Sequence, residues 1–203
     1  MSAIYIIAGP PGIGKSTKGF EYIDEYLDIL NEDEMRFRYK AKGYADYNEY
    51  SIFRVREIIR RKLIRNEDVA LELNLGFPHQ YEYALAAKKF NKENQLNVIL
   101  FFTDSLQLCL DRAKIRHDSG RHLVTPEIII EMYNNTIPLL KANFGSIDNL
   151  RLIDATRQND FLTVAEYNKE AKTLELRGQN PDWFKNDLRP FIEQCFQDQR
   201  PPN

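Results

Sequence analysis

Short apolar runs alternate with longer amphipathic segments along most of this chain. Each run is four to eight residues long, the usual length of a buried strand. The run at 97–102 is apolar after its first residue, which is typical of a strand covered on both faces. The five predicted strands lie at 3–8, 27–31, 68–75, 97–102 and 150–153.

The segments between these runs have the spacing of helices. In the segment from about 49 to 66, Ile52, Val55, Ile59 and Leu63 recur on one helical face. Further on, Thr125-Pro126 is a helix start with threonine at the N-cap and proline at N1. The other predicted helices cover 15–26, about 79–90 and 104/105 to about 116. Strands that alternate with helices predict an α/β fold, a doubly wound parallel sheet of about five strands with flanking helices.

The end of the chain has a different pattern. Alternating segments at 161–167 and 173–176 resemble a β-hairpin, and Asn180-Pro181-Asp182-Trp183 opens a last helix. We expect one domain over 1–203, with a core of about 1–157 and a hairpin–helix extension of about 158–203. Residues 197–203 are expected to fray.

Composition narrows the class of protein. The 203 residues are 43% hydrophobic and 29% charged, as in an ordinary globular domain, and the net charge is −2. This balance offers no global basic field, so nucleic acid and anionic membranes are disfavoured as partners. No apolar stretch is long enough to cross a membrane. The two cysteines, Cys109 and Cys195, lie in apolar helical patterns, which predicts reduced thiols in a cytoplasmic protein.

The strongest chemical signal follows the first strand, where the spacing is that of a P-loop, G-x-x-x-x-G-K-S. Its glycines free the backbone to turn successive N–H groups toward phosphate oxygens. The lysine places a positive charge on the β- and γ-phosphates of ATP, and the serine hydroxyl is a ligand for Mg²⁺. The segment is Gly9-Pro10-Pro11-Gly12-Ile13-Gly14-Lys15-Ser16-Thr17.

Two carboxylates and an amide are expected near this loop, because they follow strands whose carboxyl ends meet at one edge of the sheet. Asp33 can accept the proton of a substrate hydroxyl that attacks the γ-phosphoryl group. Glu72 lies in an otherwise apolar strand, so it is expected to face the site and bind Mg²⁺, a water or a substrate hydroxyl. Asn74 points to the same side, and both are candidate substrate-binding residues. The alternative is that Asp33 belongs to an acidic surface loop and Glu72 to a solvated strand end.

A basic segment further along is a candidate lid. Arg112 and Arg116 share one helix face, and the loop beyond them contains Gly120, Arg121 and His122. Arginines brought onto the transferred phosphoryl group stabilise its charge and help to exclude water. A solvated, charged helix end is the alternative interpretation.

The stretch 37–50 mixes aromatic and basic residues. Its rings could stack on a base or sugar and its lysines could meet phosphates, but an ordinary surface explains the stretch equally well. The three histidines do not have the spacing of metal ligands.

In their order along the chain, these motifs resemble the zeta-toxin family of P-loop kinases. The likeness runs from about residue 4 to residue 153. Beyond the P-loop it comprises Asn31-Glu32-Asp33-Glu34, Ala70-Leu71-Glu72, Arg112-Ala113-Lys114-Ile115-Arg116 and Gly120-Arg121-His122. Zeta-like enzymes phosphorylate a sugar hydroxyl of UDP-N-acetylglucosamine with Mg-ATP. The resemblance implies Lys15 at the phosphates, Asp33 as the base, Glu72 at the substrate and Arg112 with Arg116 at the transition state; it also implies an antitoxin as partner.

The sequence departs from the family pattern in three places. Leu73-Asn74 replaces the usual Thr-Thr, Gly120-Arg121-His122 replaces Gly-Gly-His, and Glu131-Met132 stands where a second catalytic arginine is expected. Arg121 is the candidate substitute for that arginine. The sequence therefore predicts an ATP-dependent kinase for a small hydroxyl-bearing acceptor, with a UDP-amino sugar favoured. The alternatives are a P-loop kinase for a nucleoside, a sugar or a polynucleotide end, and a nucleotide-binding switch with little turnover.

Overall fold

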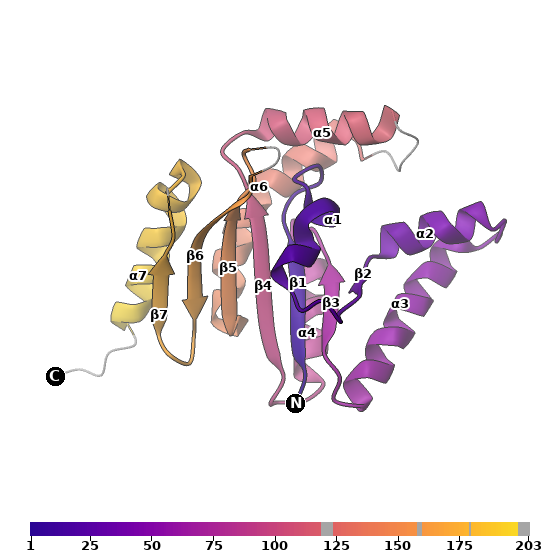
Figure 1. Cartoon of the computed structure of the whole chain (residues 1–203), viewed down its shortest axis with the longest axis horizontal. Helices are drawn as coiled ribbons and strands as arrows, with labels where there is room; N and C mark the ends of the chain where they lie inside the picture. The colour runs from indigo at the N-terminus through magenta and orange to yellow at the C-terminus, as the bar shows by residue number, and fades with distance from the viewer. Residues whose placement is uncertain (119–123, 158–159, 179, 199–203) are drawn as a thin grey trace.

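A seven-stranded mixed sheet forms the centre of the computed structural model, which describes residues 1–118, 124–157, 160–178 and 180–198. The strand order is β2-β3-β1-β4-β5-β6-β7 (Figure 1). The first five strands are mutually parallel, as expected. The sheet continues with β6, which is antiparallel to β5, and with β7, which is antiparallel to β6. The strands are β1 (Ala3–Ala8), β2 (Ile29–Leu30), β3 (Val69–Glu72), β4 (Gln95–Phe102), β5 (Asn149–Asp154), β6 (Leu162–Asn168) and β7 (Thr173–Leu176).

Most helices pack on one face of this sheet (Figure 1). Each contributes an apolar stripe to the main core; the stripe of α3 is Val55, Ile59 and Leu63. Among the described helices, α1 and η1 lie on the other face, α5 crosses above the carboxyl ends of the parallel strands, and α2 projects from the body beside β2. The helices are α1 (Lys15–Lys18), η1 (Gly19–Tyr22), α2 (Glu32–Ala41), α3 (Tyr47–Ile64), α4 (Pro78–Lys89), α5 (Leu106–Asp118), α6 (Pro126–Asn143), η2 (Phe144–Ser146), the π-helical turn η3 (Phe184–Leu188) and α7 (Arg189–Asp198).

The helix after the P-loop is much shorter than predicted. We expected it to run over 15–26, but the α-helix ends at Lys18 and a 3₁₀ turn follows. Gly19 packs so closely on the sheet that an added Cβ would lie 2.8 Å from the Ile7 side chain. The ring of Tyr22 then meets Phe101 edge-on, with centroids 5.3 Å apart. These contacts outweigh the local helical pattern, because they bury apolar surface against β1 and β4.

The acidic cluster after the second strand is the first turn of a helix, α2, which the sequence did not predict. The side chain of Asn31 caps this helix by accepting from the backbone N–H groups of Asp33 and Glu34, at 2.9 and 3.2 Å. The helix has no buried residue, so it lacks the apolar stripe on which the prediction of helices depended.

The predicted C-terminal hairpin and helix are both present. The hairpin extends the main sheet, because β6 pairs with β5 along its length. Phe184, Leu188 and Ile192 bury against the helix-covered face of the sheet. Within the described residues, none of the helices is both long and apolar enough for a membrane span.

Candidate active site

The P-loop joins β1 to α1 at the carboxyl edge of the sheet, and its glycines are required by the geometry. Gly9 and Gly12 have φ values of +134° and +81°, in the region that side chains disfavour. A Cβ on Gly9 would lie 2.2 Å from the carbonyl oxygen of Phe101, and one on Gly12 equally close to that of Cys109. The loop therefore packs directly on the backbone of β4 and α5.

Lys15 is buried beneath the loop, with 5% of its surface exposed. Its ammonium group donates to the carbonyl oxygens of Gly9 (2.7 Å) and Pro10 (3.0 Å) and to Asn74 Oδ1 (2.8 Å). Three donors thus have three acceptors within the protein. Any phosphate that binds Lys15 has to replace at least one of these bonds. Burial, assisted by the charge of Arg116, lowers the pKa of Lys15 to about 8, against the opposing effect of Glu72.

This lowered pKa predicts that ATP affinity depends on pH. Below pH 8 the ammonium group is already charged, so affinity should be nearly constant. Above pH 8 the free protein loses that proton, and phosphate binding must restore it, so the Kd for ATP should rise by up to about tenfold per pH unit. Calorimetry at pH 8.5 in buffers of different ionisation enthalpy should detect proton uptake. The variant Lys15→Met should show none; equal affinity of the wild type at pH 7 and 9.5 would contradict the prediction.

The first helical turn connects to β3 through a hydroxyl–carboxylate contact. Ser16 Oγ donates to Glu72 Oε1 at 2.9 Å, and Glu72 is the last residue of β3. Hard oxygen ligands beside phosphates suit Mg²⁺, which usually takes one or two protein oxygens. These two side chains fit that ion and would hold it at the phosphate tail. Bound there, it would neutralise charge on the β- and γ-phosphoryl groups.

A cleft of about 300 Å³ opens beside the P-loop, and Asp33, Glu72 and Asn74 all line it. The structure thus brings together the three polar residues singled out as candidates. The carboxylate of Asp33 is 59% exposed and accepts from Arg36 Nη1 at 2.7 Å. Its position on the first turn of α2 is set by the Asn31 cap. The other walls come from the end of β3, from α4, and from α6 with the residues just before it: Leu73, Gln80, Val124, Ile128 and Met132.

Four polar residues that line this cleft were not predicted as site residues: Asn31, Glu32, Arg36 and Gln80. Arg36 lies one helical turn after Asp33, and its Nε is buried without a hydrogen-bond partner among the described residues. Gln80 accepts from the backbone N–H groups of Gly76 and Phe77 and so shapes the turn before α4. The signal for Arg36 was its i,i+3 spacing from Asp33, which becomes visible only once α2 is known to be a helix.

The lid arginines occupy different environments. Arg112 Nη1 donates to the carbonyl oxygens of Ile13 (3.2 Å) and Ala155 (3.0 Å), so this side chain braces the P-loop from α5. Burial lowers its pKa. Arg116, one turn further, is exposed, and its charge acts on Lys15.

Arg121, with Gly120 and His122, lies outside the described residues. Met132, at the place of the family's second arginine, is an apolar part of the cleft wall.

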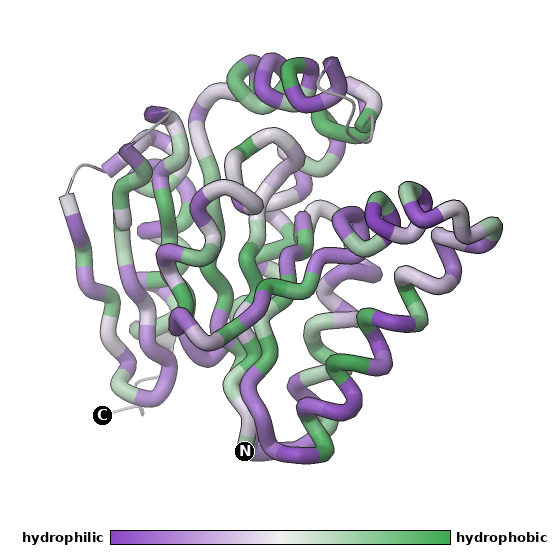
Figure 2. The backbone as a smooth tube through the Cα atoms, turned by 45° about the vertical axis from the view of Figure 1, so that its right-hand side comes forward, coloured by the Kyte–Doolittle hydropathy of each residue, from purple (hydrophilic) through white to green (hydrophobic). Residues whose placement is uncertain are grey.

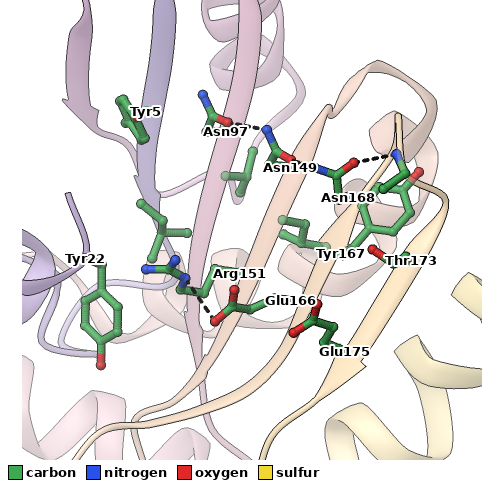
Figure 3. A pocket seen from close by; sticks show the side chains of 14 residues that line it. Tyr5, Tyr22, Asn97, Asn149, Arg151, Glu166, Tyr167, Asn168, Thr173 and Glu175 are labelled. Carbon is green, nitrogen blue, oxygen red and sulfur yellow. Dashed lines mark hydrogen bonds and ion pairs between the residues drawn. The ribbon is translucent and has the colours of Figure 1, made fainter. Parts of the chain in front are cut away.

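A larger cavity of about 450 Å³ lies elsewhere, on the sheet face that carries few helices (Figure 3). Its side chains form rows across the strands. Asn149 Nδ2 donates to Asn97 Oδ1 at 2.7 Å, and Asn168 Nδ2 donates to Asn149 Oδ1 at 2.8 Å. In the next row Arg151 pairs with Glu166 at 3.6 Å. Such pairs stabilise a solvated sheet face. Because ligands of open α/β sheets bind at the carboxyl ends of the strands, we assign the candidate site to the smaller cleft.

Comparison with known proteins shows the fold. No protein-family model matches the sequence, and none of the curated proteins matches it. Among solved structures, a chain of the AvrRxo1-ORF1:AvrRxo1-ORF2 complex with sulphate ions has a TM-score of 0.65 at 11% identity, covering 92% of this chain and 63% of its own. The PezAT toxin–antitoxin system of Streptococcus pneumoniae has a TM-score of 0.60 at 15% identity. The match covers 98% of this chain and 87% of the PezAT chain. A chain of the Pnkp1/Rnl/Hen1 RNA repair complex has a TM-score of 0.56 at 15% identity. The match covers 70% of this chain and 46% of that chain.

This chain therefore spans less than two thirds of the AvrRxo1 complex chain that it matches. The likenesses show that this chain shares the α/β fold of these proteins, and the resemblance to zeta toxins is confirmed at the level of the fold.

Proposed function

We propose that this protein is an ATP-dependent kinase that transfers the γ-phosphoryl group to a hydroxyl of an acceptor bound in the cleft. The observation that carries the proposal is the position of Asp33 in the same cleft as Glu72 and Asn74, which contact Ser16 and Lys15 of the P-loop. An acceptor in this cleft meets the carboxylate of Asp33 together with Glu72 and Asn74, the residues that contact the phosphate-binding loop. That is the arrangement that phosphoryl transfer to an alcohol requires.

Each side chain has a task in this reaction. Lys15 and the loop N–H groups hold the phosphate tail, and Asp33 accepts the proton of the attacking hydroxyl. Arg36 pairs with Asp33 and is suited to orient it or to contact an anionic part of the acceptor. Arg112 positions the loop through Ile13, and Arg116 stabilises charge on the transferred group.

A UDP-amino sugar is the favoured acceptor, because the motifs around Asp33 and Glu72 resemble those of zeta toxins and the PezAT system shares the fold. An antitoxin protein is the corresponding proposed partner. The second candidate function is a nucleotide-binding switch with little turnover. It is favoured by the bonds that hold Arg112 to two protein carbonyls and by the methionine at the second arginine position.

The test is ADP release by the purified protein with Mg-ATP, alone and with a panel of nucleotide sugars, nucleosides and sugars. Lys15→Met should reduce acceptor-dependent release by about 10²–10³-fold, because it removes a charge aimed at the transferred phosphoryl group. Lys18→Met is the matched control: that lysine, one turn on, pairs with Glu21 and should leave the rate unchanged. ATP binding without acceptor-dependent release would favour the switch.

A further inference from the structure

Helices α2 and α3 form a hairpin that projects from the body beside the short edge strand β2 (Figures 1 and 2). The two helices pack against each other. Figure 2 shows polar residues recurring along both arms. Asp33 and Arg36, on the first turns of α2, belong to the proposed kinase site. Beyond them the hairpin presents a large surface that the kinase reaction does not use.

The charge of this hairpin is opposite to that of the rest of the chain. From Glu32 to Ile64 the hairpin contains nine Lys and Arg against six Asp and Glu, a net charge of +3. Three of these acidic residues stand on the first turn of α2, so the positive charge lies beyond that turn. The remaining sequence holds 19 basic and 24 acidic residues, a net charge of −5. The expectation that nucleic acid is disfavoured rested on the total of −2, which averages over these two parts. The fold separates them and concentrates the positive charge on one projection.

Much of this positive charge is available to a ligand. Glu57 forms ion pairs with both Arg54 and Arg61, so these three side chains together keep a net positive charge. Lys42 and Arg60 form no ion pair with any described residue, and both are exposed. Pairs between exposed side chains are weak and exchange readily for a better anion.

Aromatic rings are exposed among these bases. Phe53 on α3 is 68% exposed and Phe37 on α2 is 57% exposed. Tyr44 and Tyr50 are each about half exposed and lie with their ring centroids 6.0 Å apart. On α3, the exposed side chains at positions 50, 53, 54, 60 and 61 share one face by helical spacing. That face extends over about 16 Å of helix.

We propose that the exposed face of the α2–α3 hairpin binds single-stranded nucleic acid, with arginines and lysines on phosphates and the exposed rings stacked on bases. This combination of a basic track with accessible aromatic faces is the chemistry of sequence-tolerant single-strand binding. An acidic protein would also satisfy the charges and could cover exposed rings, but rings spread along a basic track favour the stacking of successive bases. The proposal goes beyond the kinase function and does not depend on the acceptor.

The experiment measures fluorescence anisotropy of a labelled 20-nucleotide poly(U) RNA with the full chain, without ATP, over a range of salt concentrations. The double charge variant Lys42→Glu with Arg60→Glu should weaken binding at least tenfold at 100 mM salt. It should also lower the magnitude of the slope of log K against log salt concentration by about 1.4, since each lost phosphate contact contributes about 0.7. Phe53→Ala should weaken binding by about 5- to 100-fold and leave that slope unchanged, because it removes a stacked base.

Two controls make the result specific. Lys89→Glu with Lys92→Glu changes the net charge equally at exposed positions outside the hairpin and should bind like the wild type. Lys15→Met should also bind normally, which separates this proposal from the kinase function. The absence of RNA binding at 50 mM salt would overturn the proposal. So would an unchanged affinity of Phe53→Ala, or competition by poly-glutamate as strong as by RNA, which would identify an acidic protein as the partner.

Discussion

Replacing Arg116 with alanine is expected to lower the rate of phosphoryl transfer by about 10³–10⁵-fold, the effect attributed to an arginine that meets the transferred group. The side chain is exposed on α5, which crosses above the P-loop, and its charge already acts on Lys15. Because the guanidinium is needed only as negative charge develops, ATP affinity should change little while kcat falls. Single-turnover measurement with an acceptor identified in the panel separates these quantities.

Lys114→Ala is the matched control for this variant. Lys114 is exposed on the same helix and lies two residues away, hence on another face. It should leave both kcat and ATP affinity unchanged. If Arg116→Ala transfers phosphate at the wild-type rate, Arg116 belongs to the solvated end of α5 and the switch gains support.

The second large effect is expected at Asp33. The substitution Asp33→Asn keeps the size of the side chain and removes the group that accepts the hydroxyl proton, so kcat should fall by about 10²–10⁴-fold. ATP binding should persist, because the nucleotide is held by the P-loop on the other side of the cleft. Measured together, the Kd for ATP and the transfer rate should therefore separate.

Glu34 provides a close control for Asp33. It is the next residue on the same helical turn, it is exposed, and it pairs with Arg38 much as Asp33 pairs with Arg36. Glu34 does not line the cleft. Glu34→Gln should keep the wild-type rate; equal losses in the two variants would indicate a general charge effect on α2 and would remove Asp33 from the role of base.

The parts of this fold that were predictable are those where a local pattern and the final packing agree. The P-loop spacing, the five parallel strands and the α3 stripe are of this kind, since each residue's neighbours in sequence decide its role. Helix α2 was missed because it buries nothing and is held by a cap and by pairs such as Arg38–Glu34. Asn31 followed by three acidic residues was the available signal.

The candidate site was predictable as a set of residues but not as a set of contacts. The rule that parallel strands end at one edge of the sheet placed Asp33, Glu72 and Asn74 near Lys15, and the structure brings them there. That Asn74 holds the ammonium group of Lys15, and that Arg112 holds the carbonyl of Ile13, depends on long-range packing. The length of α1 likewise depends on the fit of Gly19 against β1.

The two outermost strands of the sheet are brief: β2 has two residues and β7 has four. An unpaired strand border is a template on which other chains can add, and long borders promote fibrous aggregation. Here each border offers few free peptide groups, and Glu175 with Arg177 adds charge beside β7. The protein should consequently resist open-ended polymerisation at high concentration, even though its sheet is seven strands wide.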